Sequence, residues 1–129
     1  MAERLVLDTC GLLFLASGDR RLSAQARDRI GTAATVSVVA ITGFEIALKV
    51  GQGKLRLPCP TDEWLAGVIE EYHLRKITLD IDLCRQAAEL PPIHRDPCDR
   101  FIIAASQRNR AAVVTVDPIF SGYGLEVIS

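Results

Sequence analysis

The sequence predicts an α/β protein, a three-layer α/β/α fold with a mainly parallel central sheet and helices on both faces. Short apolar runs that fit strands buried on both faces recur along the chain, and two of them stop at an aspartate. Segments with helical composition separate these runs, so strands and helices alternate. With 129 residues, 49% of them hydrophobic, residues 1–129 are expected to form one domain with a sizeable core.

The first strand is predicted at residues 5–7, an apolar run with valine at its centre that stops at Asp8. A helix then runs to about Ser17. Asp8 has two interpretations, because aspartate is a favoured N-cap and because open α/β sheets place their ligands at the carboxyl ends of strands. Asp8 by itself does not decide between them. Ser23 is expected to cap a second helix at residues 24–30, which Gly31 ends.

The second strand is predicted at residues 35–39, which are rich in β-branched side chains. Residues 41–50 have helical composition and precede two nearby glycines. Glu45 and Lys49 stand four residues apart in this helix, and a surface ion pair is the favoured interpretation of Glu45 when it is considered alone. After a connection, Thr61 is predicted to cap a helix that ends near Tyr72.

The C-terminal half continues the alternation. A third strand at residues 77–79 leads to Asp80, which can cap a helix at residues 81–90. Asp96 before Pro97 is a strong helix start, an N-cap acid followed by proline at the first helical position. This helix carries Asp99 in its first turn and is apolar on most sides. Residues 111–116 predict a buried strand that stops at Asp117, and residues 125–128 a short last strand.

Charge and cysteine content narrow the class of protein. The net charge is −1, from 15 basic and 16 acidic residues, so any nucleic-acid binding must use a local patch. The four cysteines are unevenly spaced and form no C-x-x-C pair, which disfavours a zinc site and a disulfide framework. We expect each of them to be a small core residue in a reducing compartment. Without a signal-peptide core or a membrane-length apolar run, the protein is expected to be cytoplasmic.

Four acidic residues are expected to meet at one edge of the sheet. Asp8 and Asp117 follow buried strands, whereas Glu45 and Asp99 lie in the first turns of helices. In a parallel sheet with crossover helices, the carboxyl ends of the strands and the amino ends of the helices that follow share one side. Clustered carboxylates repel one another, and a hard cation such as Mg²⁺ or Mn²⁺ would neutralise them. Such a site suits phosphodiester hydrolysis without a nucleophilic side chain.

The motifs around these acids carry a family resemblance that covers essentially the whole chain. They are LDT with Asp8, FEIALKVGQGKL with Glu45, HRDPCDRFIIAASQ with Asp99, and VVTVD with Asp117. The chain resembles a PIN domain, and among these a VapC-type toxin ribonuclease of a toxin–antitoxin pair. The resemblance implies a PIN-like fold, RNA hydrolysis that depends on Mg²⁺, and a metal site built from the four acids.

The resemblance also implies roles for individual residues. Asp8 and Asp99 are the surest metal ligands, while Glu45 and Asp117 complete the site directly or through water. Thr9 and Thr115 would be supporting hydroxyls, and Asp96 is left outside the site because its capping role accounts for it. Neither histidine, His73 or His94, is assigned a role. The basic residues that could hold RNA phosphates are Lys49, Lys54, Arg56, Arg95 and Arg100, although for any one of them an ordinary solvated surface is the preferred interpretation.

Two positions depart from the family pattern. Cys98 stands where an aromatic residue is usual, and Gly43-Phe44 replaces a small residue followed by tryptophan. Both departures are expected to alter packing rather than metal binding. As partners, the resemblance implies an RNA substrate, a VapB-like antitoxin and a second copy in a homodimer, with no membrane. An exposed apolar surface that includes Phe14, Leu15 and Leu48 is expected for the protein contacts.

Three alternatives remain to be weighed. A receiver domain, which accepts phosphate on an aspartate, pairs two acids after its first strand and carries a lysine after its last, but Thr9 and Cys10 follow Asp8 and no lysine follows Lys76. A phosphatase with a D-x-D motif is disfavoured because residue 10 is cysteine. A PIN-like binding module without activity is disfavoured because all four acids are present.

Overall fold

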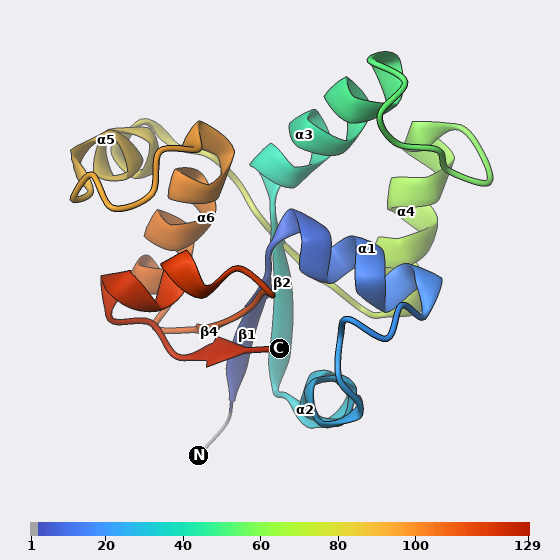
Figure 1. The fold of residues 1–129 in the computed structure, drawn as a ribbon, viewed down its shortest axis with the longest axis horizontal. Coiled ribbons are helices and arrows are strands. Elements are labelled where there is room, and N and C mark those ends of the chain that lie inside the picture. Colours follow the sequence, from blue (N-terminus) through green and yellow to red (C-terminus); the bar gives the residue numbers. More distant parts are fainter. Residues whose placement is uncertain (1–2) are drawn as a thin grey trace.

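The computed structural model describes residues 3–129 and contains one five-stranded sheet in which every strand pair is parallel (Figure 1). The strand order is β3-β2-β1-β4-β5, so β1 lies at the centre. The strands are β1 (Arg4–Leu7), β2 (Thr35–Val39), β3 (Arg75–Ile77), β4 (Ala112–Val114) and β5 (Val127–Ile128).

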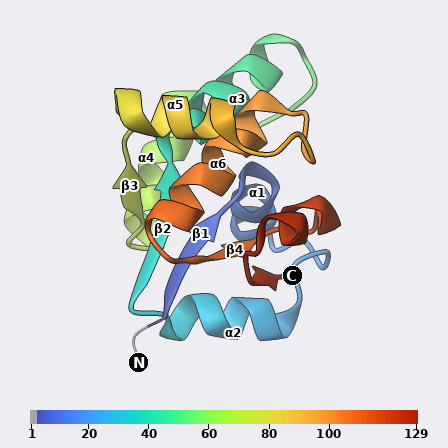
Figure 2. The ribbon, with the colours of Figure 1, turned by 90° about the vertical axis from the view of Figure 1, so that its left-hand side faces the viewer.

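Helices cover both faces of this sheet, as the view turned by 90° also shows (Figure 2). They are α1 (Thr9–Ser17), α2 (Ala24–Thr32), α3 (Ala40–Gly51), α4 (Thr61–Glu71), α5 (Ile81–Glu89), α6 (Pro97–Arg108) and the 3₁₀ helix η1 (Pro118–Tyr123). Among residues 3–129, none of the helices combines the length and the apolar character needed to cross a bilayer.

Two apolar clusters form the core, one on each face of the sheet. Leu5 and Leu7 of β1 pack with residues of α1, α2 and α4, whereas Val6 between them packs with residues of α5 and α6. Successive strand residues point to opposite faces, so β1 serves both clusters and has to be apolar throughout. The predicted three-layer α/β/α architecture with a parallel sheet is therefore confirmed.

Strand lengths are set by the neighbouring strands rather than by the apolar runs. β3 was expected at residues 77–79 but ends at Ile77, because its partner β2 ends at Val39 and the two residues are paired. β4 was expected to reach residue 116 but ends at Val114, which pairs with Leu7 at the end of β1. A strand beyond the end of its partner has no ladder to join.

The predicted helix caps are confirmed at Ser23, Asp80 and Asp96, whose side chains accept hydrogen bonds from backbone N–H groups of the first turn. Two boundary predictions are wrong. Thr61 is the first residue of α4, and Pro60 before it has no capping side chain. Gly31 lies inside α2, which continues to Thr32.

The prediction that every cysteine is a core residue is wrong. Cys59 and Cys84 are exposed, and Cys10 and Cys98 are half-buried; all four are free thiols. Cys84 follows Leu83, which is buried against the sheet, and therefore lies on the outer side of α5. The expected apolar surface also needs correction, since Leu15 is buried and Phe14 is half-covered under the Arg21 guanidinium, while Leu48 is exposed.

Candidate metal centre

Asp8 lies where β1 passes into α1. Its Oδ1 accepts a hydrogen bond from the Gly11 N–H at 2.6 Å, so it caps α1. The residue is also 4% exposed and lies at the carboxyl end of the central strand, where the Asp8 N–H donates to the Val114 carbonyl at 3.1 Å. Gly11 is required there because a Cβ would come within 2.6 Å of the Val114 oxygen. The two interpretations of Asp8 are thus compatible.

Glu45 projects from α3 toward the start of α1. Its Oε1 accepts a hydrogen bond from the Thr9 hydroxyl at 2.6 Å, and its Oε2 lies 3.4 Å from Lys49 Nζ. The predicted ion pair between Glu45 and Lys49 therefore forms, but the Glu45 side chain is only 13% exposed and is not an ordinary surface group. The Thr9 hydroxyl also lies 3.2 Å from that of Thr42, which ties α1 to α3.

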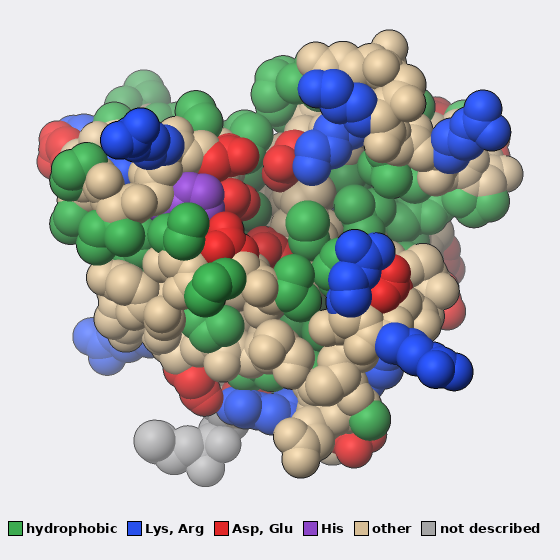
Figure 3. Space-filling model, viewed as in Figure 1, with side chains coloured by type: hydrophobic (Ala, Val, Ile, Leu, Met, Phe, Trp, Pro, Cys, Tyr) green, Lys and Arg blue, Asp and Glu red, His purple; other side chains and the backbone are tan. Residues whose placement is uncertain are grey.

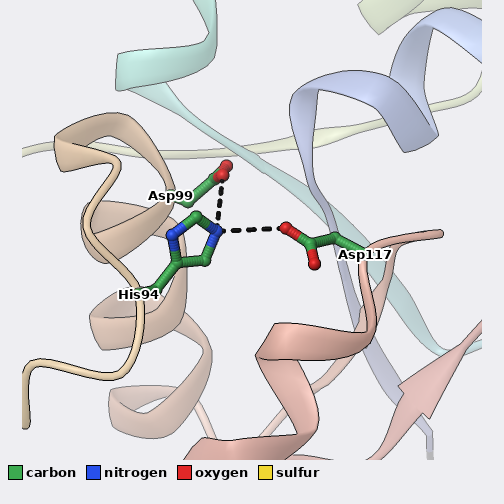
Figure 4. Close-up of side chains that lie close together, drawn as sticks. All are labelled: His94, Asp99 and Asp117. Carbon is green, nitrogen blue, oxygen red and sulfur yellow. Dashed lines mark hydrogen bonds and ion pairs between the residues drawn. The ribbon is translucent and has the colours of Figure 1, made fainter.

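Asp99 and Asp117 approach each other across the ring of His94 (Figure 4). The His94 Nε2 lies 2.9 Å from Asp99 Oδ2 and 3.1 Å from Asp117 Oδ2. One ligand atom from each of the three residues fits within 4.8 Å, which is compact enough to hold a metal ion. Asp96 caps α6 as predicted, accepting from the N–H groups of Cys98 and Asp99.

The acidic side chains gather in a hollow between the α5–α6 side and the α3–α4 side of the molecule (Figure 3). Their charges act on one another. The pKa of Asp8 is raised to about 6, mainly by burial and further by the charges of Glu45 and Asp117. The hydrogen bonds from Thr115 and Gly11 lower this pKa but do not cancel the rise. The pKa of Asp99 is raised to about 7, mainly by burial and further by the charges of Asp96, Asp8 and Glu45. The charge of His94 acts in the opposite direction and lowers this pKa. The folded chain therefore brings all four predicted acids into one electrostatic group.

This donor set fits a divalent cation. Burial and neighbouring negative charges make the anionic forms of Asp8 and Asp99 unfavourable in the folded protein. A cation between the carboxylates would remove this cost. Carboxylate oxygens suit Mg²⁺ and Mn²⁺. The two threonines expected as supporting hydroxyls both contact the acids, since Thr9 donates to Glu45 and the Thr115 Oγ1 accepts from the Asp117 N–H at 3.0 Å.

The surroundings of two residues at this site differ from what the sequence indicated. His94, which was given no role, is 8% exposed and contacts two of the four acids. Arg100, considered for RNA phosphates, instead donates hydrogen bonds to five backbone carbonyls. Lys54, Arg56 and Arg95 are exposed.

Cys98, the departure from the family pattern that lies next to Asp99, is half-buried beside the acids. Burial, together with the charges of Glu45, Asp96 and Asp99, raises the pKa of its thiol to about 11. The thiol therefore stays protonated at neutral pH. Phe44, the other departure, is 58% exposed on α3.

Comparisons with known proteins agree with this fold and identify the family. The PIN domain family matches residues 5–124. Ribonuclease VapC22 of Mycobacterium tuberculosis is 30% identical over 114 residues, which cover 88% of this chain and 86% of that protein. The structure of VapBC2 from Rickettsia felis, bound to a DNA fragment from its promoter, superposes with a TM-score of 0.69 at 14% identity, covering 96% of each chain.

A toxin–antitoxin complex from Klebsiella pneumoniae superposes with a TM-score of 0.67 at 18% identity, over 97% of this chain and 96% of that one. At 14% and 18% identity, the solved structures support the fold alone. The family match and the relative from Mycobacterium tuberculosis show the family. The chain belongs to the PIN domain family, and within it to the VapC type.

Proposed function

We propose that this protein is a divalent-metal-dependent endoribonuclease and the toxin of a VapBC-type toxin–antitoxin pair, acting in the cytoplasm. The observation that carries the proposal is the convergence of Asp8, Glu45, Asp99 and Asp117 from four separate elements, with raised pKa values at Asp8 and Asp99. A protein that only needed a stable fold would gain nothing from burying repelling carboxylates together. The relative Ribonuclease VapC22 supports RNA as the substrate.

In this proposal Asp8 and Asp99 would hold the cation, and Glu45 and Asp117 would complete the site directly or through water. Mg²⁺ is the expected ion, and Mn²⁺ can replace it. When bound, such a cation would supply Lewis-acid chemistry to the scissile phosphate, the attacking water and the leaving oxygen.

The chain's own groups fix the carboxylates for that task. The Gly11 N–H and the Thr115 hydroxyl orient Asp8, and the Thr9 hydroxyl orients Glu45. The exposed bases Lys54 and Arg56, which follow α3, and Arg95 are proposed to hold RNA phosphates.

RNA cleavage with matched variants tests this activity. Purified wild type should cut total RNA with Mg²⁺ and stop when a chelator is added, and Asp99→Asn should not cut. Asp62→Asn, which removes an exposed acid from the first turn of α4, is the matched control and should cut like wild type. A silent binding module would leave the RNA intact in every case, and equal cleavage by wild type and Asp99→Asn would contradict the metal site.

The toxin role has its own test. Expressed alone in a bacterial host, wild type should arrest growth and Asp99→Asn should not, while the product of an adjacent small gene should relieve the arrest. We further propose that this VapB-like antitoxin and a second copy of the chain bind exposed apolar side chains, among them Leu48 at 45% exposure. A monomer that arrests growth regardless of any neighbouring gene product would contradict the partner proposal.

A further inference from the structure

The His94 side chain is buried between two carboxylates that come from different elements. Asp99 lies in the first turn of α6 and Asp117 caps η1 after β4, while His94 belongs to the loop that precedes α6. Its Nε2 is within hydrogen-bond distance of one oxygen from each acid (Figure 4). Two roles fit this placement, because Nε2 can either offer its lone pair to a metal ion or donate a hydrogen to the two carboxylates.

The other ring nitrogen distinguishes these roles. The Asp96 N–H donates to His94 Nδ1 at 3.2 Å, so Nδ1 serves as an acceptor and carries no hydrogen. A neutral imidazole whose Nδ1 is an acceptor has its hydrogen on Nε2. Binding a cation through Nε2 would move that hydrogen to Nδ1, where it would face the Asp96 N–H.

The backbone of His94 is fixed on both sides. Its N–H donates to the Tyr123 hydroxyl at 2.6 Å, and that hydroxyl donates to the Pro91 carbonyl at 2.8 Å. Its carbonyl accepts from Arg100 at 3.0 Å. The ring packs edge-on against Phe120, with centroids 5.6 Å apart and an interplanar angle of 86°. The direction of Nε2 is therefore determined by the surrounding structure.

Arg100 extends this support to the whole loop. Its guanidinium uses all five N–H groups on backbone carbonyls, those of Ala87, Ala88, Leu90, Pro91 and His94. These carbonyls belong to the end of α5 and the loop that carries His94, where helix carbonyls lack partners of their own. These five hydrogen bonds from one arginine fix the backbone of the loop that carries His94.

We propose that His94 is a positioning residue which donates its Nε2 hydrogen to Asp99 and Asp117 and holds the two carboxylates at the spacing that the cation requires. The proposal rests on the nuclease function above and assigns His94 a part in it. The donated hydrogen offsets the repulsion between the two acids before the cation arrives. His94 leaves the direct coordination to the carboxylates, which keeps the oxygen-only donor set that suits Mg²⁺.

Metal titration of three variants tests the proposal. Gln at residue 94 retains an N–H donor at the reach of Nε2, whereas Leu keeps apolar bulk and removes the donor; His73→Asn, at an exposed turn with φ 52°, is the matched control. His94→Leu should weaken Mg²⁺ and Co²⁺ binding by the same factor, on the order of 10–100-fold, with a parallel loss of RNA cleavage. His94→Gln should recover most of both, and His73→Asn should match wild type.

A loss confined to Co²⁺ would overturn the proposal, because imidazole is a preferred ligand of transition metals and the result would make His94 a ligand. Unchanged binding by His94→Leu would reduce His94 to a packing residue. NMR of wild type labelled with ¹⁵N at histidine gives a readout that needs neither folding of a variant nor nuclease activity. The Nε2–H tautomer is expected with and without Mg²⁺, and the Nδ1–H tautomer in the loaded protein would contradict the proposal.

Discussion

Replacing Asp8 by asparagine should stabilise the metal-free protein. Asparagine keeps the shape of the side chain and an oxygen that can cap α1 through the Gly11 N–H, but it removes the buried charge. The pKa of Asp8 is raised from 3.8 to about 6, a difference that corresponds to about 3 kcal/mol. Above pH 6 the variant should therefore gain up to about 3 kcal/mol in the free energy of unfolding, which is on the order of 10 °C in Tm for a domain of this size.

The gain should depend on pH in a defined direction. Because the pKa of Asp8 is higher in the folded state than in the unfolded state, the folded protein takes up the proton first as pH falls. The penalty in wild type is complete above pH 6, shrinks between pH 6 and 3.8, and is absent below that range. The difference in the free energy of unfolding between Asp8→Asn and wild type should therefore shrink over the same pH range.

Asp80→Asn is the matched control, because Asp80 caps α5 with the same geometry but carries the opposite shift. Its side chain accepts from Leu83 N–H at 2.7 Å, and the Arg108 hydrogen bond lowers its pKa to about 2. Since this pKa is depressed, its contribution to stability is present above pH 3.8 and is lost as pH falls toward 2. Asp80→Asn should therefore destabilise the protein at neutral pH.

Urea unfolding at pH 8 and pH 4.5, with chelator and then with excess Mg²⁺, measures both effects. At a hundredfold excess over Kd, Mg²⁺ should add about 2.7 kcal/mol to wild type and much less to Asp8→Asn. An unchanged stability of metal-free Asp8→Asn at pH 8 would mean that Asp8 is only a helix cap, because asparagine caps a helix as well as aspartate does. An equal response of wild type and variant to Mg²⁺ would also refute the reasoning.

Further predictions concern the supports of the site. Gly11→Ala should destabilise the protein by about 1–3 kcal/mol, because the new Cβ would lie 2.6 Å from the Val114 oxygen; Gly31→Ala, inside α2 with open space around it, should instead stabilise it by about 0.5–1 kcal/mol. Thermal melts of the pair test this, and equal effects would argue against a close approach at Gly11. Arg100→Lys should lower the free energy of unfolding in urea by about 2–4 kcal/mol, since lysine cannot supply five donors. The control Arg95→Lys, at an exposed position, should change it little. An Arg100→Lys variant as stable as wild type would contradict the support that Arg100 gives to the loop.

The parts of the fold and site that could be predicted follow from local rules. Asp8 and Asp117 come after buried strands, and strand ends in a parallel sheet share an edge, so their approach follows from sequence order. The cap at Asp96 is a hydrogen bond between residues three positions apart, and the Asp-Pro pair predicts it.

The parts that escaped prediction depend on contacts between distant segments. His94 lies in a loop without periodicity, and its contact with Asp117 spans 23 residues. Arg100 was expected at a solvated surface because a charged residue ordinarily lies there, and only the folded loop shows the five carbonyls that accept from it. The end of β3 depends on where β2 stops, which the run at residues 77–79 does not reveal.

The central claim is that the carboxylate cluster is a divalent-cation site, and Mn²⁺ titration followed by electron paramagnetic resonance tests it most directly. Metal-free wild type should bind Mn²⁺ in stoichiometric amount, and Asp8→Asn and Asp99→Asn should each lose most of that binding. Asp80→Asn, which removes a carboxylate that pairs with Arg108 and is not one of the four clustered acids, should bind as wild type does. Absence of binding in wild type, or binding by Asp8→Asn and Asp99→Asn as strong as that of wild type, would contradict the account.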